Sequence, residues 1–92
     1  MRDKLILGAL VQLKFPNSEV VQWHLVTRND FVGFPPHVFN IATKELVWLH
    51  HWTCKHCNHK PKIVGFIAPE MTSMVISDAI ETLIKNTPLK EI

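Results

Sequence analysis

The sequence has little of several features that mark common protein classes. Its longest apolar run, Leu5 to Val11, has seven residues, whereas a bilayer-spanning helix needs about 20. Three glycines provide no glycine-rich loop that could cradle a phosphate group. Ten basic residues against eight acidic ones leave a net charge of only +2, which is too small to imply bulk nucleic-acid binding. A membrane-spanning helix and a phosphate-loop enzyme are therefore disfavoured.

Cysteine is also scarce, and its placement bears on the compartment. The chain has two cysteines, Cys54 and Cys57, whereas a secreted disulfide scaffold normally carries four or more. Arg2 and Lys4 precede the apolar start of the chain, but no small-residue cleavage pattern of a signal peptide follows. We therefore expect an intracellular, cytoplasmic protein in a reducing environment.

Length and composition are those of one folded unit. The chain has 92 residues, of which 47% are hydrophobic and 20% charged, so its composition is that of a globular domain. This predicts a single compact domain over residues 1–92. A core of this size is of marginal stability, and a bound metal or partner subunit would add to it.

Alternating apolar residues predict a sheet. Every odd position of segment 5–15 is apolar, as a half-buried strand requires, although a helix over 4–13 is an alternative. Further strands are predicted at 20–27, 37–42, 45–53 and 62–67. The last of these is expected to return antiparallel to 45–53.

One helix is predicted at the C-terminal end of the chain. It begins at Pro69, ends at Asn86, and carries its apolar residues on one half of its surface. The expected fold is therefore α+β, an antiparallel sheet of four to five strands with one C-terminal amphipathic helix packed on one face. Because the strands are apolar on both sides, the second sheet face is expected to dock on a protein partner or to form a homodimer.

The chemistry of the chain is concentrated in residues 50–62, which we call the knuckle segment. It holds both cysteines and four of the six histidines. Thiolate and imidazole are the ligands that Zn²⁺ prefers, and a Cys-x-x-Cys turn directs two sulfurs at one ion. The segment resembles the metal-binding knuckle of zinc-ribbon proteins, in which Cys-x-x-Cys lies between two strands. Zinc ribbons have a second cysteine pair, which this chain lacks, so the resemblance extends to Cys54 and Cys57 alone.

A structural zinc site needs four protein ligands, and the sequence offers several ways to complete it. The local set is Cys54, Cys57, His51 and His59, with His50 as a substitute. Remote histidines, His24 and His37, are a second route. A third is a site shared between two chains. The alternative to all three is a segment without metal, whose thiols are free.

Three functions are compatible with this pattern. The first is a small regulatory module that is stabilised by zinc and recognises a protein without catalysis. The second is binding of nucleic acid or a small anionic nucleotide through the basic, His- and Trp-rich edge 48–62. The residues expected to contact the ligand or partner are Trp48, Trp52, Lys55, Lys60 and Lys62. The third is a small metal-dependent enzyme, which the absence of paired carboxylates disfavours.

Overall fold

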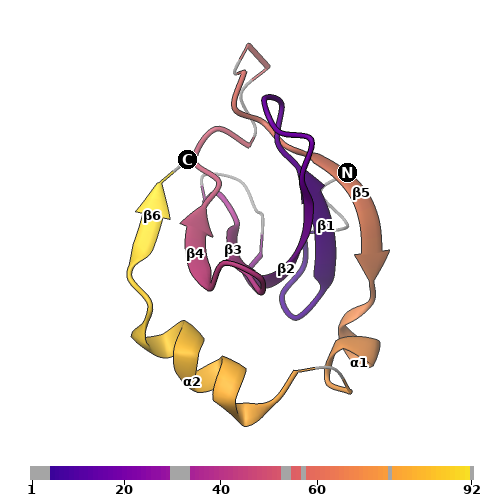
Figure 1. The fold of residues 1–92 in the computed structure, drawn as a ribbon, viewed down its shortest axis with the longest axis vertical. Helices are drawn as coiled ribbons and strands as arrows, with labels where there is room; N and C mark the ends of the chain where they lie inside the picture. The colour runs from indigo at the N-terminus through magenta and orange to yellow at the C-terminus, as the bar shows by residue number, and fades with distance from the viewer. Residues whose placement is uncertain (1–4, 30–33, 53–54, 57, 75, 92) are drawn as a thin grey trace.

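The fold is an α+β arrangement that consists mostly of sheet (Figure 1). It is seen in a computed structural model that describes residues 5–29, 34–52, 55–56, 58–74 and 76–91. The described elements are β1 (Leu10–Lys14), β2 (Val21–Arg28), β3 (His37–Asn40), β4 (Glu45–Trp48), β5 (Lys62–Ile67), α1 (Pro69–Thr72), α2 (Asp78–Asn86) and β6 (Leu89–Glu91). The predicted class is confirmed, but the counts of strands and helices are not.

The six strands form one mixed sheet in the order β5-β1-β2-β3-β4-β6. Neighbours from β5 to β4 are antiparallel, whereas β6 runs parallel to β4. The prediction of four to five antiparallel strands missed β6. This strand has three residues, too few for an alternating pattern, and it forms because the chain returns from α2 along the free edge of β4.

The predicted pairing of the knuckle's two flanking strands is wrong. Strand β5 has the predicted bounds, but it pairs with β1, where Leu10 lies opposite Ile67 and Leu13 opposite Ile63. Strand β4 ends at Trp48 rather than continuing to residue 53, and both of its edges are taken by β3 and β6. The knuckle segment is therefore a connection between distant strands and not the turn of a hairpin.

The first strand is shorter than predicted, and residues 5–9 form a turn before it. Gly8 has a φ of +88°, a left-handed conformation that glycine adopts readily, and the Ala9 amide donates to the carbonyl of Ile6. The alternation nevertheless holds in part, because Leu5 and Ala9 are fully buried. Leu7 is the exception and is 60% exposed.

The single predicted helix is interrupted. Helix α1 ends at Thr72, and α2 begins at Asp78 after a non-helical Ser77. The two pieces lie along one side of the sheet (Figure 1), and the break lets the chain bend around it. The longest described helix, α2, has nine residues, so no helix in the described part of the chain is long enough to cross a bilayer.

Each face of the sheet carries a buried hydrophobic cluster. The sheet curls, and its inner face packs with residues outside the strands into a buried cluster of Leu5, Ala9, Val11, Leu13, Val26, Val38, Val47, Leu49 and Trp52. The outer face carries Leu10, Leu25 and Phe39, which pack against Ile76, Ile80, Leu83 and Ile84. Residues of α2 and Ile76 before it therefore pack on this face, where one continuous helix was predicted. The other face was expected to dock on a partner or a second copy; it carries this buried cluster, while Val64 and Phe66 on β5 remain exposed.

Candidate functional site

Histidine rings gather at the ends of the knuckle segment. The rings of His51 and His59 have centroids 5.9 Å apart. His50 lies between its neighbours, with its centroid 4.6 Å from the Trp48 ring and 4.8 Å from that of His51. The stretch that leads into β5 projects beyond the strands (Figure 1). The fold thus brings together the two local histidines predicted as zinc ligands.

The sulfur ligands cannot be placed in the same way. Cys54 and Cys57 lie outside the described residues. Among the residues that are described, no three His, Cys, Asp or Glu side chains are grouped so that they could hold a metal ion. A site built on His51 and His59 therefore depends on the two thiolates to complete it.

The two remote histidines have other surroundings. His24 on β2 is buried, with Nδ1 2.9 Å from the carbonyl oxygen of Gln22. Burial lowers the pKa of His24, and that hydrogen bond opposes the shift. His37 on β3 lies opposite Trp48, and its pKa is lowered by burial and then by the positive charge of Arg28.

The two tryptophans that were expected to stack bases do not share one exposed surface. Trp52 is 3% exposed and belongs to the inner core. The Lys60 ammonium lies 5.4 Å from the centroid of its ring, within the range of a cation–π contact. Trp48 is half-buried, with the His50 ring at its edge. Trp48 and Trp52 therefore do not form the exposed aromatic surface for base stacking that the sequence suggested.

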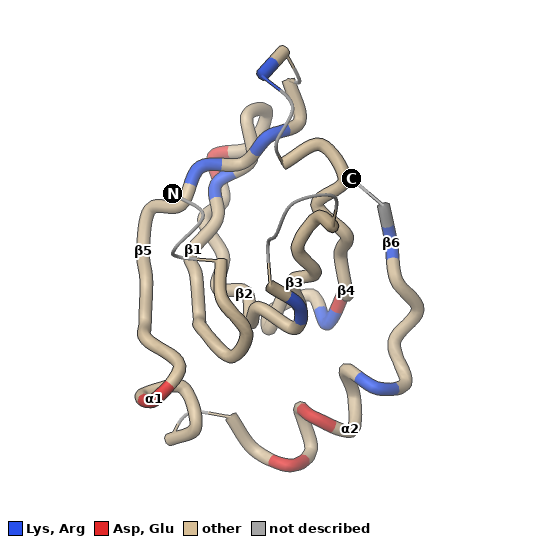
Figure 2. Tube along the Cα trace, turned by 180° about the vertical axis from the view of Figure 1, so that it is seen from behind, with Lys and Arg blue, Asp and Glu red and all other residues tan. Residues whose placement is uncertain are grey.

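Two lysines of the knuckle segment and one of β1 line a single cavity. A cavity of about 370 Å³, here called the lysine cavity, is lined by Lys14, Pro16, Lys60 and Lys62. Lys14 and Lys62 lie directly opposite each other across β1 and β5. In Figure 2 basic positions gather where these strands meet the chain that enters β5. The predicted contact residues Lys60 and Lys62 therefore share one site.

Lys14 is the member of this site that the sequence did not reveal. It lies 48 positions before Lys62 in the chain, and only the pairing of β1 with β5 brings the two together. No acidic side chain in the described ranges lies within ion-pair distance of Lys14, Lys60 or Lys62. Lys55, also predicted as a contact residue, is exposed and does not line the cavity.

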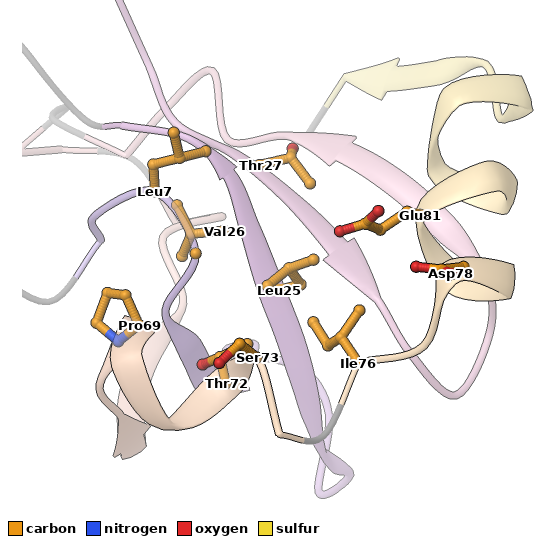
Figure 3. Close-up of a pocket in the computed structure, with 11 residues that line it drawn as sticks. Leu7, Leu25, Val26, Thr27, Pro69, Thr72, Ser73, Ile76, Asp78 and Glu81 are labelled. Carbon is orange, nitrogen blue, oxygen red and sulfur yellow. The ribbon is translucent and has the colours of Figure 1, made fainter.

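A cavity of different character lies between the helices and the outer face of β2 (Figure 3). Its volume is about 490 Å³, and its apolar wall includes Leu7, Leu25 and Ile76. Asp78 and Glu81 of α2 stand at its side (Figure 3). The carboxylates of Asp78 and Glu81 give this cavity a negative charge, whereas the lysine cavity is positively charged. An anion would therefore be attracted to the lysine cavity and repelled by this one.

No family model, curated protein or solved structure matches the chain.

Proposed function

We propose that this chain is a small binding module without catalysis, which recognises an acidic segment of a partner protein through the lysine cavity. The observation that carries the proposal is the direct pairing of Lys14 with Lys62, with Lys60 beside them. Like charges directly opposite on a sheet are destabilising, and no described acidic side chain pairs with them. Carboxylates of a partner would remove that repulsion, which makes binding favourable.

We further propose that zinc holds the knuckle segment next to this cavity. The ligands would be Cys54, Cys57, His51 and His59, since thiolate and imidazole suit Zn²⁺. The support is the approach of the two histidine rings. The ion would fix residues on both sides of the cysteine pair and so position Lys60, which follows His59 in the chain. A reducing compartment such as the cytoplasm would keep these thiols available for the metal.

A protein partner is favoured over nucleic acid by the state of the tryptophans. Single-strand binders combine basic grooves with exposed aromatic rings, but Trp52 is buried under Lys60. A different protein is also favoured as the partner over a second copy of this chain. The reason is that the sheet face expected to form a homodimer carries the buried inner cluster. The lysine cavity itself remains open to phosphates, so nucleic acid is the competing outcome of the test.

The zinc proposal is tested by metal content. Protein purified without added metal should contain one zinc per chain by mass spectrometry, and Cys54→Ser and Cys57→Ser should lose it. The matched control is His56→Ser, because His56 belongs to the same segment but is not a proposed ligand. A wild-type chain without zinc, or a control that loses zinc as readily, would contradict the site. Half a zinc per chain in a dimer would indicate the shared site instead.

The binding proposal is tested by fluorescence anisotropy with a labelled oligoglutamate peptide and a labelled oligothymidine. The peptide should bind more tightly, and Lys62→Glu should weaken it at least about tenfold, which corresponds to about 1.4 kcal/mol. Lys85→Glu is the control, because it makes the same charge change on α2, outside the cavity. Equal losses in both variants would show unspecific charge attraction, and tighter oligothymidine binding would favour nucleic acid.

A further inference from the structure

A polar cavity of about 270 Å³ lies at the ends of β2, β3 and β4, apart from the lysine cavity. Its lining includes Gln22, His24 and Asn40, with Phe15 and Val47 as apolar walls. We call it the His24 cavity. Its volume is slightly below the roughly 300–1,000 Å³ of pockets for drug-sized ligands, so a molecule that filled it would be smaller.

His24 lines this cavity and has one ring nitrogen, Nε2, without a partner among the described residues. Its Nδ1 lies 2.9 Å from the carbonyl oxygen of Gln22, which can only accept, so Nδ1 carries the proton. Burial of the side chain, which is 2% exposed, disfavours a second proton on the ring. Nε2 is therefore an acceptor, and it has no partner among the described residues. A buried polar atom without a partner is costly.

A hydrogen-bond donor belongs to the lining of the same cavity. The side-chain amide of Asn40 donates to Oε1 of Gln22 over 2.7 Å, which leaves the Gln22 NH₂ group as a donor without a partner among the described residues. Asn40 is itself fixed, because its Oδ1 accepts from the backbone amides of Ala42 and Thr43 at 2.9 and 3.0 Å. The orientation of the Gln22 amide is thus set by the β3–β4 turn.

The charges at this cavity neutralise each other. The Glu45 carboxylate is paired with the Lys90 ammonium, and both residues line the cavity. The remaining lining is uncharged and includes Thr43, with the Phe15 ring edge-on to the His24 ring at a centroid distance of 6.3 Å. Such a lining offers no net charge to a charged ligand.

We infer that the His24 cavity binds a small, uncharged, planar molecule that carries an N–H donor next to an acceptor, namely a carboxamide or a nitrogen heterocycle. The donor would bond Nε2 of His24, and the acceptor would take a hydrogen from the Gln22 amide. The aromatic edge of Phe15 and the side chain of Val47 would contact the ring of the ligand. This site is independent of the lysine cavity and of the proposed zinc.

The test is an NMR titration of the full chain with nicotinamide and with adenine, observing the imidazole nitrogens of His24. Both probes should shift the Nε2 resonance and the amide signals of Gln22 and Asn40 in a saturable way, with dissociation constants of about 1 mM or tighter. Acetate and methylammonium, which carry charge, should leave these signals in place. Absence of a saturable shift, or equal shifts with the charged probes, would overturn the inference and leave a cavity that holds water only.

Two variants locate the binding. His24→Phe keeps a ring of similar size but lacks the acceptor, and it should weaken nicotinamide binding at least tenfold. If this variant does not fold, the nitrogen shifts of the wild-type chain still decide the question. Lys62→Glu should bind nicotinamide as the wild type does, so a failure of the lysine proposal would be distinguishable from a failure of this one. Unchanged nicotinamide binding by folded His24→Phe would contradict the inference.

Discussion

Lys62→Glu is expected to stabilise the fold while it weakens binding of the acidic partner. Lys14 and Lys62 are direct neighbours across β1 and β5, so their Cβ atoms are about 5 Å apart. With the ammonium groups about 6 Å apart in water, the repulsion is about 0.7 kcal/mol. Replacing one lysine by glutamate turns this repulsion into an attraction of similar size.

Salt screening reduces the expected gain. At physiological ionic strength the Debye length is about 8 Å, so roughly half of the combined effect survives, or about 0.5–1 kcal/mol. For a chain of this length that corresponds to a rise in Tm of about 3–6 °C. Thermal unfolding followed by circular dichroism measures the shift, and the gain should shrink at molar salt, where the Debye length is about 3 Å.

A charge-swap cycle separates pairing from simple loss of a cation. Lys14→Glu alone should stabilise the fold as Lys62→Glu does. The double variant again places like charges opposite each other, so its Tm should return close to the wild-type value. Additive stabilisation in the double variant, or no change in either single variant, would refute the cross-strand repulsion on which the proposed binding site depends.

Two further predictions concern packing and pH. Gly65→Ala should destabilise the fold by about 1–3 kcal/mol in chemical denaturation. The reason is that a Cβ at this position would lie 2.6 Å from Oε1 and 2.9 Å from Cβ of Gln12. A stabilised variant would show that β1 and β5 are not so close together. Burial lowers the pKa values of His24 and His37 in the folded chain. As the pH falls, the unfolded chain therefore takes up protons at a higher pH than the folded chain does. Stability should be highest above about pH 6.5 and should fall as the pH drops below it. His24→Phe should reduce this loss of stability, measured by urea titration between about pH 6.5 and pH 5. Glu45 stays ionised over that range, because its hydrogen bond from Lys90 lowers its pKa. An unchanged dependence of stability on pH would contradict the assignment to His24.

Residues that lie close together in the chain determined the elements that the sequence could predict. The short β-branched run of 62–67 predicted the bounds of β5, and the patterns of 20–27 and 45–53 located β2 and the start of β4. The apolar half of 69–86 identified the side chains that cover the outer face, including Ile80 and Leu83. These signals are local, since side-chain direction alternates every residue in a strand and repeats every 3.6 residues in a helix.

The candidate metal ligands were also found locally, and they stay a prediction. His51 and His59 flank Cys54 and Cys57 within nine positions, so their proximity follows from a short loop. The end of α1 at Thr72 and the new start of α2 at Asp78 were not predicted, because the apolar pattern of the sequence continues between them. Propensity and periodicity within one segment do not show where the chain must bend to follow a curved sheet.

Pairing between distant segments could be decided only by the tertiary structure. Which edge accepts β5 depends on which edges the other strands leave free, and β3 and β6 occupy both edges of β4. That choice places Lys14 against Lys62 and so creates the lysine cavity. The curl of the sheet also forms the buried inner cluster on the face that was expected to dock on a partner. Neither the strand pairing nor the curl of the sheet can be deduced from the order of residues in the chain. The reason is that the free energy of each strand pairing depends on all the other pairings.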